Sequence, residues 1–270
     1  MRDVAFGQFY PTDSFIHKLD PRTKLLAVIV YIVAIFLCVH YFSYLACFVF
    51  LVISILVSRV PVKSVLKTVK MVMFIVVVTL IINVFFYTDG TPLLEWWKIK
   101  ITDEGLIYAS KMAMRLIFLV VATSLITLTT TPMNLTDGLE SLLTPLKWIK
   151  IPVHDLAIIM SIALRFIPTF MEEIDKIMMA QKARGAAFDN GGLIKRAKAM
   201  LPILIPLFVS AFRRADELAL ALDARCYNAT DKRTKMKKLT LSWRDLVAAV
   251  AVSAFLALVI MMKTGFFGLL

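Results

Sequence analysis

The chain has 270 residues, 60% of them hydrophobic, and its mean hydropathy is +0.80. A soluble domain of this length cannot bury so large an apolar share, so the composition indicates an integral membrane protein. Lys and Arg outnumber Asp and Glu by 31 to 19, a net charge of +12. In a membrane protein such an excess is typical of cytoplasmic loops, and we expect no nucleic-acid partner.

The first apolar segment is long enough for two membrane-spanning helices. Residues 25–58 contain no Asp, Glu, Lys or Arg. A single helix of that length would measure about 51 Å, whereas the hydrocarbon core is about 30 Å thick. We therefore expect two helices, 24–40 and 42–58, joined by a turn near His40–Ser43. Asp20–Pro21 is typical of the start of a helix, with Asp as the cap and Pro in the first turn. The residues before it lack the apolar core and cleavage site of a signal peptide, so we expect no cleavage.

Two further spans are predicted on either side of an acidic loop. Residues 71–88 form an uncharged segment, and 107–128 form the second span, with Lys111 and Arg115 one turn apart near its outer end. The loop between them, 89–104, carries four acidic residues, two Lys and a Trp pair. This composition predicts a loop on the outer face, with the Trp side chains at the interface.

A basic segment separates these four spans from the last one. Residues 132–244 hold eighteen basic and eleven acidic residues, which predicts a cytoplasmic domain. The predicted membrane domain with the first four spans covers residues 1–131, and the basic segment follows it. The last segment, 245–270, contains the final span near 246–262. Five spans would leave the N-terminus inside and the C-terminus outside.

Three helices are predicted in the basic segment, a short one at 135–143 and long ones at 155–184 and 193–226. The fold class is therefore an all-α integral membrane protein with about five transmembrane helices plus a cytoplasmic domain of one short and two long helices. Two apolar stretches, Leu156–Leu164 and Leu201–Phe212, are too short to span the bilayer. We interpret them as buried parts of the long helices, with partial re-entry into the bilayer as the alternative.

The two long helices end in similar sequences. At an offset of forty-one residues, the matching endings are Ala183, Arg184 and Gly185 and Ala224, Arg225 and Cys226. A cation in the last turn interacts favourably with the helix dipole, and small neighbours leave its guanidinium accessible. One such ending is an ordinary stop signal, but two suggest a pair of docking points.

The chain resembles the transmembrane (T) component of energy-coupling factor (ECF) transporters, the prokaryotic importers of vitamins and transition metals. The resemblance covers nearly the whole chain and rests on Leu19–Leu25 (LDPRTKL), Ala163–Pro168 (ALRFIP), Ala180–Gly185 (AQKARG) and Ala224–Cys226 (ARC). It implies a multi-pass protein of the cell membrane whose cytoplasmic part is a coupling domain of one short and two long crossing helices. It also implies that the protein joins two ABC-type ATPase subunits to a substrate-binding S component. The S component chooses the cargo.

The resemblance also implies roles for particular residues. Arg184 and Arg225 match the arginines that dock into grooves on the two ATPases. The family usually has Gly after the second arginine, whereas this chain has Cys226. Because Cys adopts the left-handed conformation poorly, we expect the second long helix to continue toward Asn228.

Methionines on the long helices are candidates for contact with the S component. These residues are Met160, Met171, Met178 and Met179. A flexible thioether suits a surface that must fit several partners. The alternative is core packing between the crossed helices.

Several patterns are missing from the sequence. It has no phosphate-binding loop, so we expect no catalytic activity and no cofactor on this chain, with ATP and Mg on the partner ATPases. A proton relay would require Asp or Glu within the membrane, and the predicted spans contain neither residue. Three scattered cysteines suggest neither a disulfide framework nor a metal site. The alternative functions are a conventional ABC importer permease that carries the substrate path itself, an intramembrane enzyme and a membrane scaffold.

Overall fold

The computed structural model describes residues 9–86, 91–96, 99–149, 152–186, 192–227 and 240–264. The chain divides into two compact units, the first made of residues 1–157 and 239–270 and the second of residues 158–238.

The first unit contains six of the described α-helices in full, the first residues of α6, and one small hairpin. In chain order the elements are α1 (Pro21–Leu37), α2 (Tyr41–Ser58), α3 (Val62–Phe86), β1 (Pro92–Trp96), β2 (Ile99–Thr102), α4 (Asp103–Thr129), α5 (Pro132–Leu143), a 3-10 turn (Thr144–Ile149), the first residues of α6 (Val153–Ala183) and α8 (Trp243–Lys263). The second unit holds the rest of α6 and all of α7 (Leu193–Ala224). The predicted helical class is confirmed.

The hairpin lies in the loop that the sequence analysis left without structure. Strands β1 and β2 pair antiparallel, with Glu95 opposite Lys100. Thr102, the last residue of β2, pairs with Pro92 and also caps α4 by accepting a hydrogen bond from the Gly105 N–H at 3.2 Å. The hairpin therefore leads the chain directly into the fourth span.

Five of the described helices, α2, α3, α4, α6 and α8, are long and apolar enough to cross a membrane. The sequence predicted about five spans, and the structure has five candidates among its described helices. The two sets differ in one helix, because α6 is a candidate and α1 is not. Helix α1 has 17 residues and measures about 25 Å, so it is shorter than these five. Helix α6 continues through Pro168 for 31 residues, which joins its apolar first half to the rest. The placement of α6 in the cytoplasm stays a prediction.

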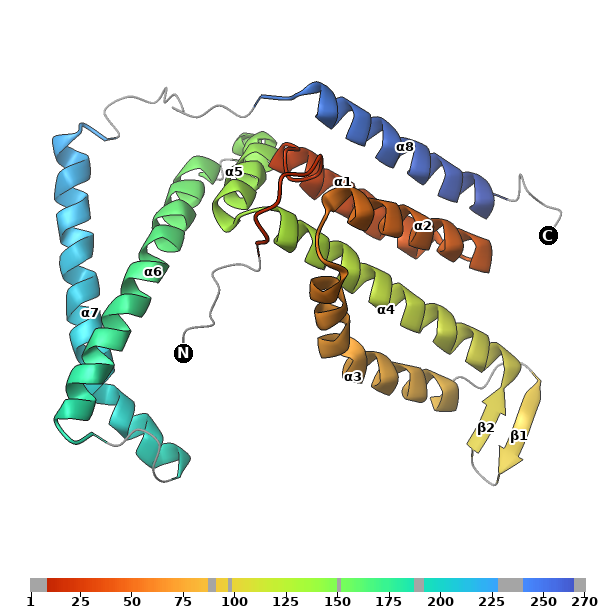
Figure 1. Cartoon of the computed structure of the whole chain (residues 1–270), viewed down its shortest axis with the longest axis horizontal. Helices are drawn as coiled ribbons and strands as arrows, with labels where there is room; N and C mark the ends of the chain where they lie inside the picture. The colour runs from red at the N-terminus through yellow and green to blue at the C-terminus, as the bar shows by residue number, and fades with distance from the viewer. Residues whose placement is uncertain are drawn as a thin grey trace. The chain divides into compact units, whose positions relative to one another are not determined.

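Helix α1 is the centre of the first unit. It packs against α2, α4, α5 and α8, and these helices lie side by side in Figure 1. Ala34 and Ile35 on α1 are fully buried. Tyr31, Phe50 and Phe255 stack on one another, with ring centroids 4.4–5.8 Å apart, and join α1 to α2 and α8. In contrast, α3 contacts mainly α4 and exposes most of its apolar side chains.

Residues of the Leu19–Leu25 motif join three helix ends: the start of α1, the start of α8 and the end of α4. Asp20 caps α1, as predicted, by accepting from the Arg22 N–H at 2.9 Å. The Asp20 N–H donates to Asp245 Oδ1 at 2.8 Å, which joins the start of α1 to the start of α8. Lys24 Nζ donates to the Thr129 carbonyl at 2.9 Å at the end of α4. The motif therefore has a clear structural role in the first unit.

Helix α5 packs closely on the start of α1. A β-carbon added to Gly138 would lie 2.8 Å from Pro21 Cβ and 3.1 Å from its carbonyl carbon. Only Gly allows this approach. The sequence analysis grouped residues 135–143 with the coupling domain, whereas by compactness α5 belongs to the first unit.

Candidate functional site

Helix α6 ends in a complete Schellman motif. Gly185 has a φ of +88°, in the left-handed region that favours glycine. The Gly185 N–H donates to the Lys182 carbonyl at 3.0 Å, and the Ala186 N–H donates to the Gln181 carbonyl at 3.0 Å. These two bonds satisfy carbonyls that the helix end would otherwise leave unpaired. Arg184 therefore lies at the C-cap position, between the last helical residue and the reversal.

Helix α7 ends in the same motif, although Cys226 occupies the glycine position. Cys226 has a φ of 53°, and its N–H donates to the Asp223 carbonyl at 2.9 Å. The Tyr227 N–H donates to the Leu222 carbonyl at 3.0 Å. Both hydrogen bonds match those at the end of α6, with each donor and each acceptor forty-one residues further along the chain.

The expectation that α7 continues toward Asn228 is wrong, because the helix ends at Ala224 and Arg225 is its C-cap. Asn228 itself lies outside the described residues. The left-handed conformation costs a residue with a β-carbon about 1–2 kcal/mol. Two terminal hydrogen bonds at about 1 kcal/mol each are sufficient to offset that cost.

Both arginines are exposed. Arg184 and Arg225 lie on the surface together with Ala183 and Ala224, which are also exposed. Among the residues that the structure describes, neither guanidinium has a hydrogen-bond or ion-pair partner. Each is therefore available to a planar acceptor such as a carboxylate, which Arg binds through two parallel hydrogen bonds.

One ion pair connects the two long helices at related positions. Arg214 Nη2 on α7 lies 3.1 Å from Glu173 Oε2 on α6, and the Arg214 guanidinium lies 5.9 Å from the centroid of the Phe170 ring. Glu173 and Arg214 are forty-one residues apart, which is the offset of the two endings. Each ending lies eleven residues beyond its member of the pair, or about 16 Å along the helix axis.

Sequence analysis missed this ion pair. Asp175 and Asp216 also match at the offset of forty-one, and both are exposed. The signal in the sequence was that Glu173 and Arg214 carry opposite charges and are forty-one residues apart, like the two endings. Figure 1 shows that α6 and α7 end at opposite ends of the helix pair, so the two arginines form two separate sites.

The candidate methionines differ in exposure. Met160 and Met179 are exposed, with 50% and 63% of their surface accessible, whereas Met171 and Met178 are partly buried. In α7, Leu204, Phe208 and Phe212 are also exposed. The long helices therefore present apolar surface that the second unit does not cover by itself.

Comparison with known proteins identifies the family. The model of the cobalt transport protein family CbiQ matches residues 12–236. A Clostridium kluyveri protein described as energy-coupling factor transporter transmembrane protein EcfT is 49% identical over 97% of this chain and 98% of its own length. Proteins with the same description from Ruminiclostridium cellulolyticum and Bacillus subtilis are 49% and 40% identical, over 99% and 97% of this chain and 100% and 99% of their own lengths. The chain therefore belongs to the family of transmembrane components of energy-coupling factor transporters, a family of multi-pass membrane proteins.

Proposed function

We propose that this chain is the coupling subunit of an ECF-type importer, which transmits ATP-driven motion from two ATPase subunits to a substrate-binding S component. The observation that carries the proposal is the pair of identical Schellman endings, each with an exposed arginine at the C-cap. Two equivalent sites at opposite ends of a helix pair suit two ATPase subunits of similar shape.

Docking would use the charge and shape of each ending. Arg184 and Arg225 lie where the negative end of a helix dipole holds a cation favourably. An acidic groove on an ATPase would accept the guanidinium through two hydrogen bonds, and the small residues beside it allow close approach. The guanidinium of Arg is a rigid, planar group that binds through two hydrogen bonds, whereas the ammonium of Lys is a point charge on a flexible side chain. A Lys at either position would therefore transmit force less directly.

Substitution of the arginines tests this role. Loss or reversal of one charge in a buried interfacial pair costs about 2–5 kcal/mol, so Arg184→Glu should weaken ATPase binding roughly thirty-fold or more. Arg225→Glu should have a similar effect, because its ending has the same geometry. The measurement is co-purification with the two ATPases and ATP-dependent uptake by the assembled complex.

Two other substitutions provide matched controls. Lys176 on α6 and Arg213 on α7 are exposed and lie in the same helices, but not at their ends. Lys176→Glu and Arg213→Glu make the same charge reversals, and both should keep the ATPases bound. Normal uptake by Arg184→Glu and Arg225→Glu, or equal loss in the controls, would exclude the docking role.

The proposed S-component contact involves Met160, Met171, Met178 and Met179. The exposure of Met160 and Met179 supports it, because these thioethers already lie on the surface. Replacement of Met160 and Met179 by Gln should reduce recovery of the S component in a pull-down while both ATPases remain bound. Replacement of Met171 and Met178, which are partly buried, should reduce recovery less. Undiminished recovery in all variants would contradict this contact.

A further inference from the structure

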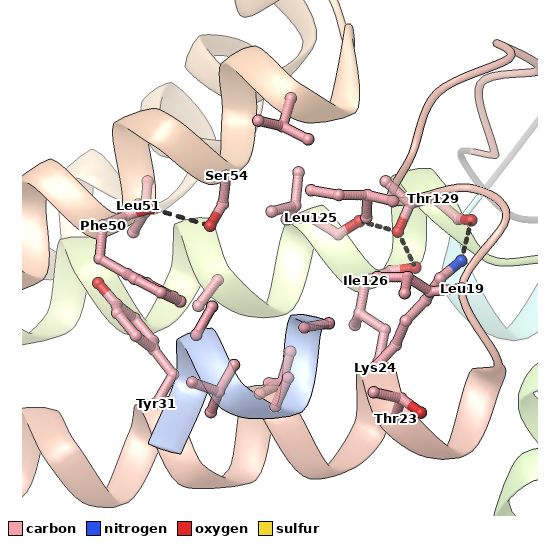
Figure 2. Close-up of a pocket in the computed structure, with 18 of the residues that line it drawn as sticks. Leu19, Thr23, Lys24, Tyr31, Phe50, Leu51, Ser54, Leu125, Ile126 and Thr129 are labelled. Atoms are coloured by element: carbon pink, nitrogen blue, oxygen red, sulfur yellow. Dashed lines mark hydrogen bonds between the residues drawn. The ribbon is translucent and has the colours of Figure 1, made fainter. Parts of the chain in front are cut away.

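The first unit contains an apolar pocket of about 220 Å³ between α1, α2, α4 and α8. Figure 2 shows Lys24, Thr129 and Leu19 at one end and Tyr31 and Phe50 at the other. Lys24 and Tyr31 are seven residues apart on α1, so the pocket extends about 10 Å along the helix axis.

Several polar side chains around this pocket already have hydrogen-bond partners within the chain. Lys24 Nζ donates its three protons to the His17 carbonyl, the Thr129 carbonyl and Thr130 Oγ1, at 2.9–3.2 Å. The Tyr31 hydroxyl donates to the Cys47 carbonyl, and the Ser54 hydroxyl donates to a carbonyl one helical turn away. A pocket with such walls suits an apolar guest, because a cavity of about 150 Å³ lined by aliphatic and aromatic side chains already excludes water and binds benzene.

The pocket opens toward the surface of the first unit. Phe15, Ile53 and Val57 line it and are exposed, with 38%, 54% and 41% of their surface accessible. Helix α2, which carries Ile53 and Val57, is one of the five candidate spans. The opening therefore lies beside a candidate membrane span.

A basic depression adjoins the opening. It shares Phe15 and Val57 with the apolar pocket and is also lined by Lys18, Arg59 and Arg244. Its acidic residue, Asp13, pairs with Lys18, whose Nζ lies 3.2 Å from Asp13 Oδ1. In the described part of the chain, the side chains of Arg59 and Arg244 have no hydrogen-bond or ion-pair partner. The depression therefore has an excess of positive charge.

The depression lies at a membrane boundary. Arg59 directly follows α2, and Arg244 is in the first turn of α8. Trp243 beside it is 75% exposed, as expected for a Trp at the headgroup level. Arg59 also has a φ of 53°, a conformation that costs a residue with a β-carbon about 1–2 kcal/mol. Arg59 thus occupies a left-handed backbone position where Gly would be less strained.

We propose that the apolar pocket and the basic depression together bind one anionic phospholipid. An acyl chain occupies the pocket through its opening beside Ile53 and Val57. The phosphate headgroup lies among Lys18, Arg59 and Arg244, where charge complementarity favours an anionic over a zwitterionic lipid. Bound there, the lipid contacts α1, α2 and α8 and stabilises their packing at this boundary. This inference does not depend on the proposed coupling role.

The test uses the full chain in nanodiscs of dioleoyl phosphatidylcholine that contain a minor fraction of dioleoyl phosphatidylglycerol. Native mass spectrometry after release from the nanodisc counts the lipids that remain bound. One phosphatidylglycerol should remain in preference to phosphatidylcholine. Each arginine near an anionic headgroup contributes roughly five-fold in affinity, so Arg59→Gln with Arg244→Gln should lower retention by more than ten-fold.

Matched variants separate this site from general surface charge. Lys63→Gln with Lys67→Gln removes two exposed charges at the start of α3, outside the depression, and should leave retention unchanged. Ala251 lines the apolar pocket, so Ala251→Phe should block the acyl chain and reduce retention although every arginine is present. Ala257→Phe on the exposed face of α8 is its control.

Four results would overturn the proposal. The first is equal retention of phosphatidylglycerol and phosphatidylcholine, and the second is equal loss in the lysine and arginine variants. The third is displacement of the lipid by inorganic phosphate, which would indicate an anion site without acyl-chain recognition. Ala251→Phe tests the pocket independently if the double arginine variant fails to fold, and unchanged retention in it would equally overturn the proposal.

Discussion

Cys226 occupies the same left-handed position at the end of α7 that Gly185 occupies at the end of α6. Both residues donate the first of the two hydrogen bonds that close the Schellman motif. The terminal hydrogen bonds are equivalent, but the backbone cost is not, because only Cys226 carries a β-carbon. The second ending is therefore the weaker of two otherwise equal structures.

Substitution of Cys226 by Gly should stabilise the end of α7. Removal of the β-carbon relieves about 1–2 kcal/mol of backbone strain, while the more flexible unfolded chain returns about 0.4–1 kcal/mol of that gain. A net gain of roughly 0.5–1 kcal/mol should slow hydrogen exchange of the amides of residues 226 and 227. Cys226→Ala keeps the β-carbon and should change nothing. Faster exchange in the Gly variant would contradict this account.

At the scale of elements, the contact between α5 and α1 depends on one glycine. The backbone of Pro21 lies so close to Gly138 that even a methyl group must displace it. Proline is rigid and begins α1, so it cannot move aside cheaply. The position of α5 is therefore coupled to the start of the central helix.

Gly138→Ala should destabilise the first unit. Overpacking of a tight contact costs about 1–3 kcal/mol, partly offset by the higher helix propensity of Ala. The melting temperature of the purified protein in detergent should fall. Gly192→Ala is the control, because no atom lies within 4 Å of its added β-carbon. An unchanged melting temperature in Gly138→Ala would show that α5 moves freely on α1.

The two long helices of the second unit are linked more weakly than α5 and α1. In the described part of the second unit, α6 and α7 are linked by the Glu173–Arg214 ion pair and by the contact of Arg214 with Phe170. Partly exposed ion pairs contribute about 1 kcal/mol or less. Such a weak link suits a pair of helices that gains much of its stability from partners.

At the scale of the whole molecule, the sidedness proposed from the charge distribution places the second unit in the cytoplasm. The described residues provide an internal reporter, because Cys226 is exposed whereas Cys38 and Cys47 are buried. A membrane-impermeant maleimide should therefore label the protein in inverted vesicles and not in right-side-out vesicles. Cys226→Ser should abolish the labelling. Labelling of the wild type in right-side-out vesicles would reverse the proposed orientation.

The sequence by itself determined the helical membrane class, because long uncharged segments have few other stable structures. It also located the helices to within a few residues, except where α3 begins nine residues before the predicted span. Asp20 and Pro21 predicted the start of α1 because caps depend on local chemistry alone. The two arginine endings were visible because their motif repeats at a fixed offset.

Tertiary structure alone decided how these parts meet. Cys38 and Cys47 seemed unrelated in sequence, yet the turn between α1 and α2 brings their Sγ atoms to 3.5 Å. The burial of Lys24 against the end of α4 and the approach of Gly138 to Pro21 join residues more than a hundred positions apart. The left-handed Cys226 depended on a balance between backbone strain and two hydrogen bonds, which residue preference alone predicted wrongly. Local chemistry sets where helices begin and end, whereas contacts between helices depend on packing that no single segment encodes.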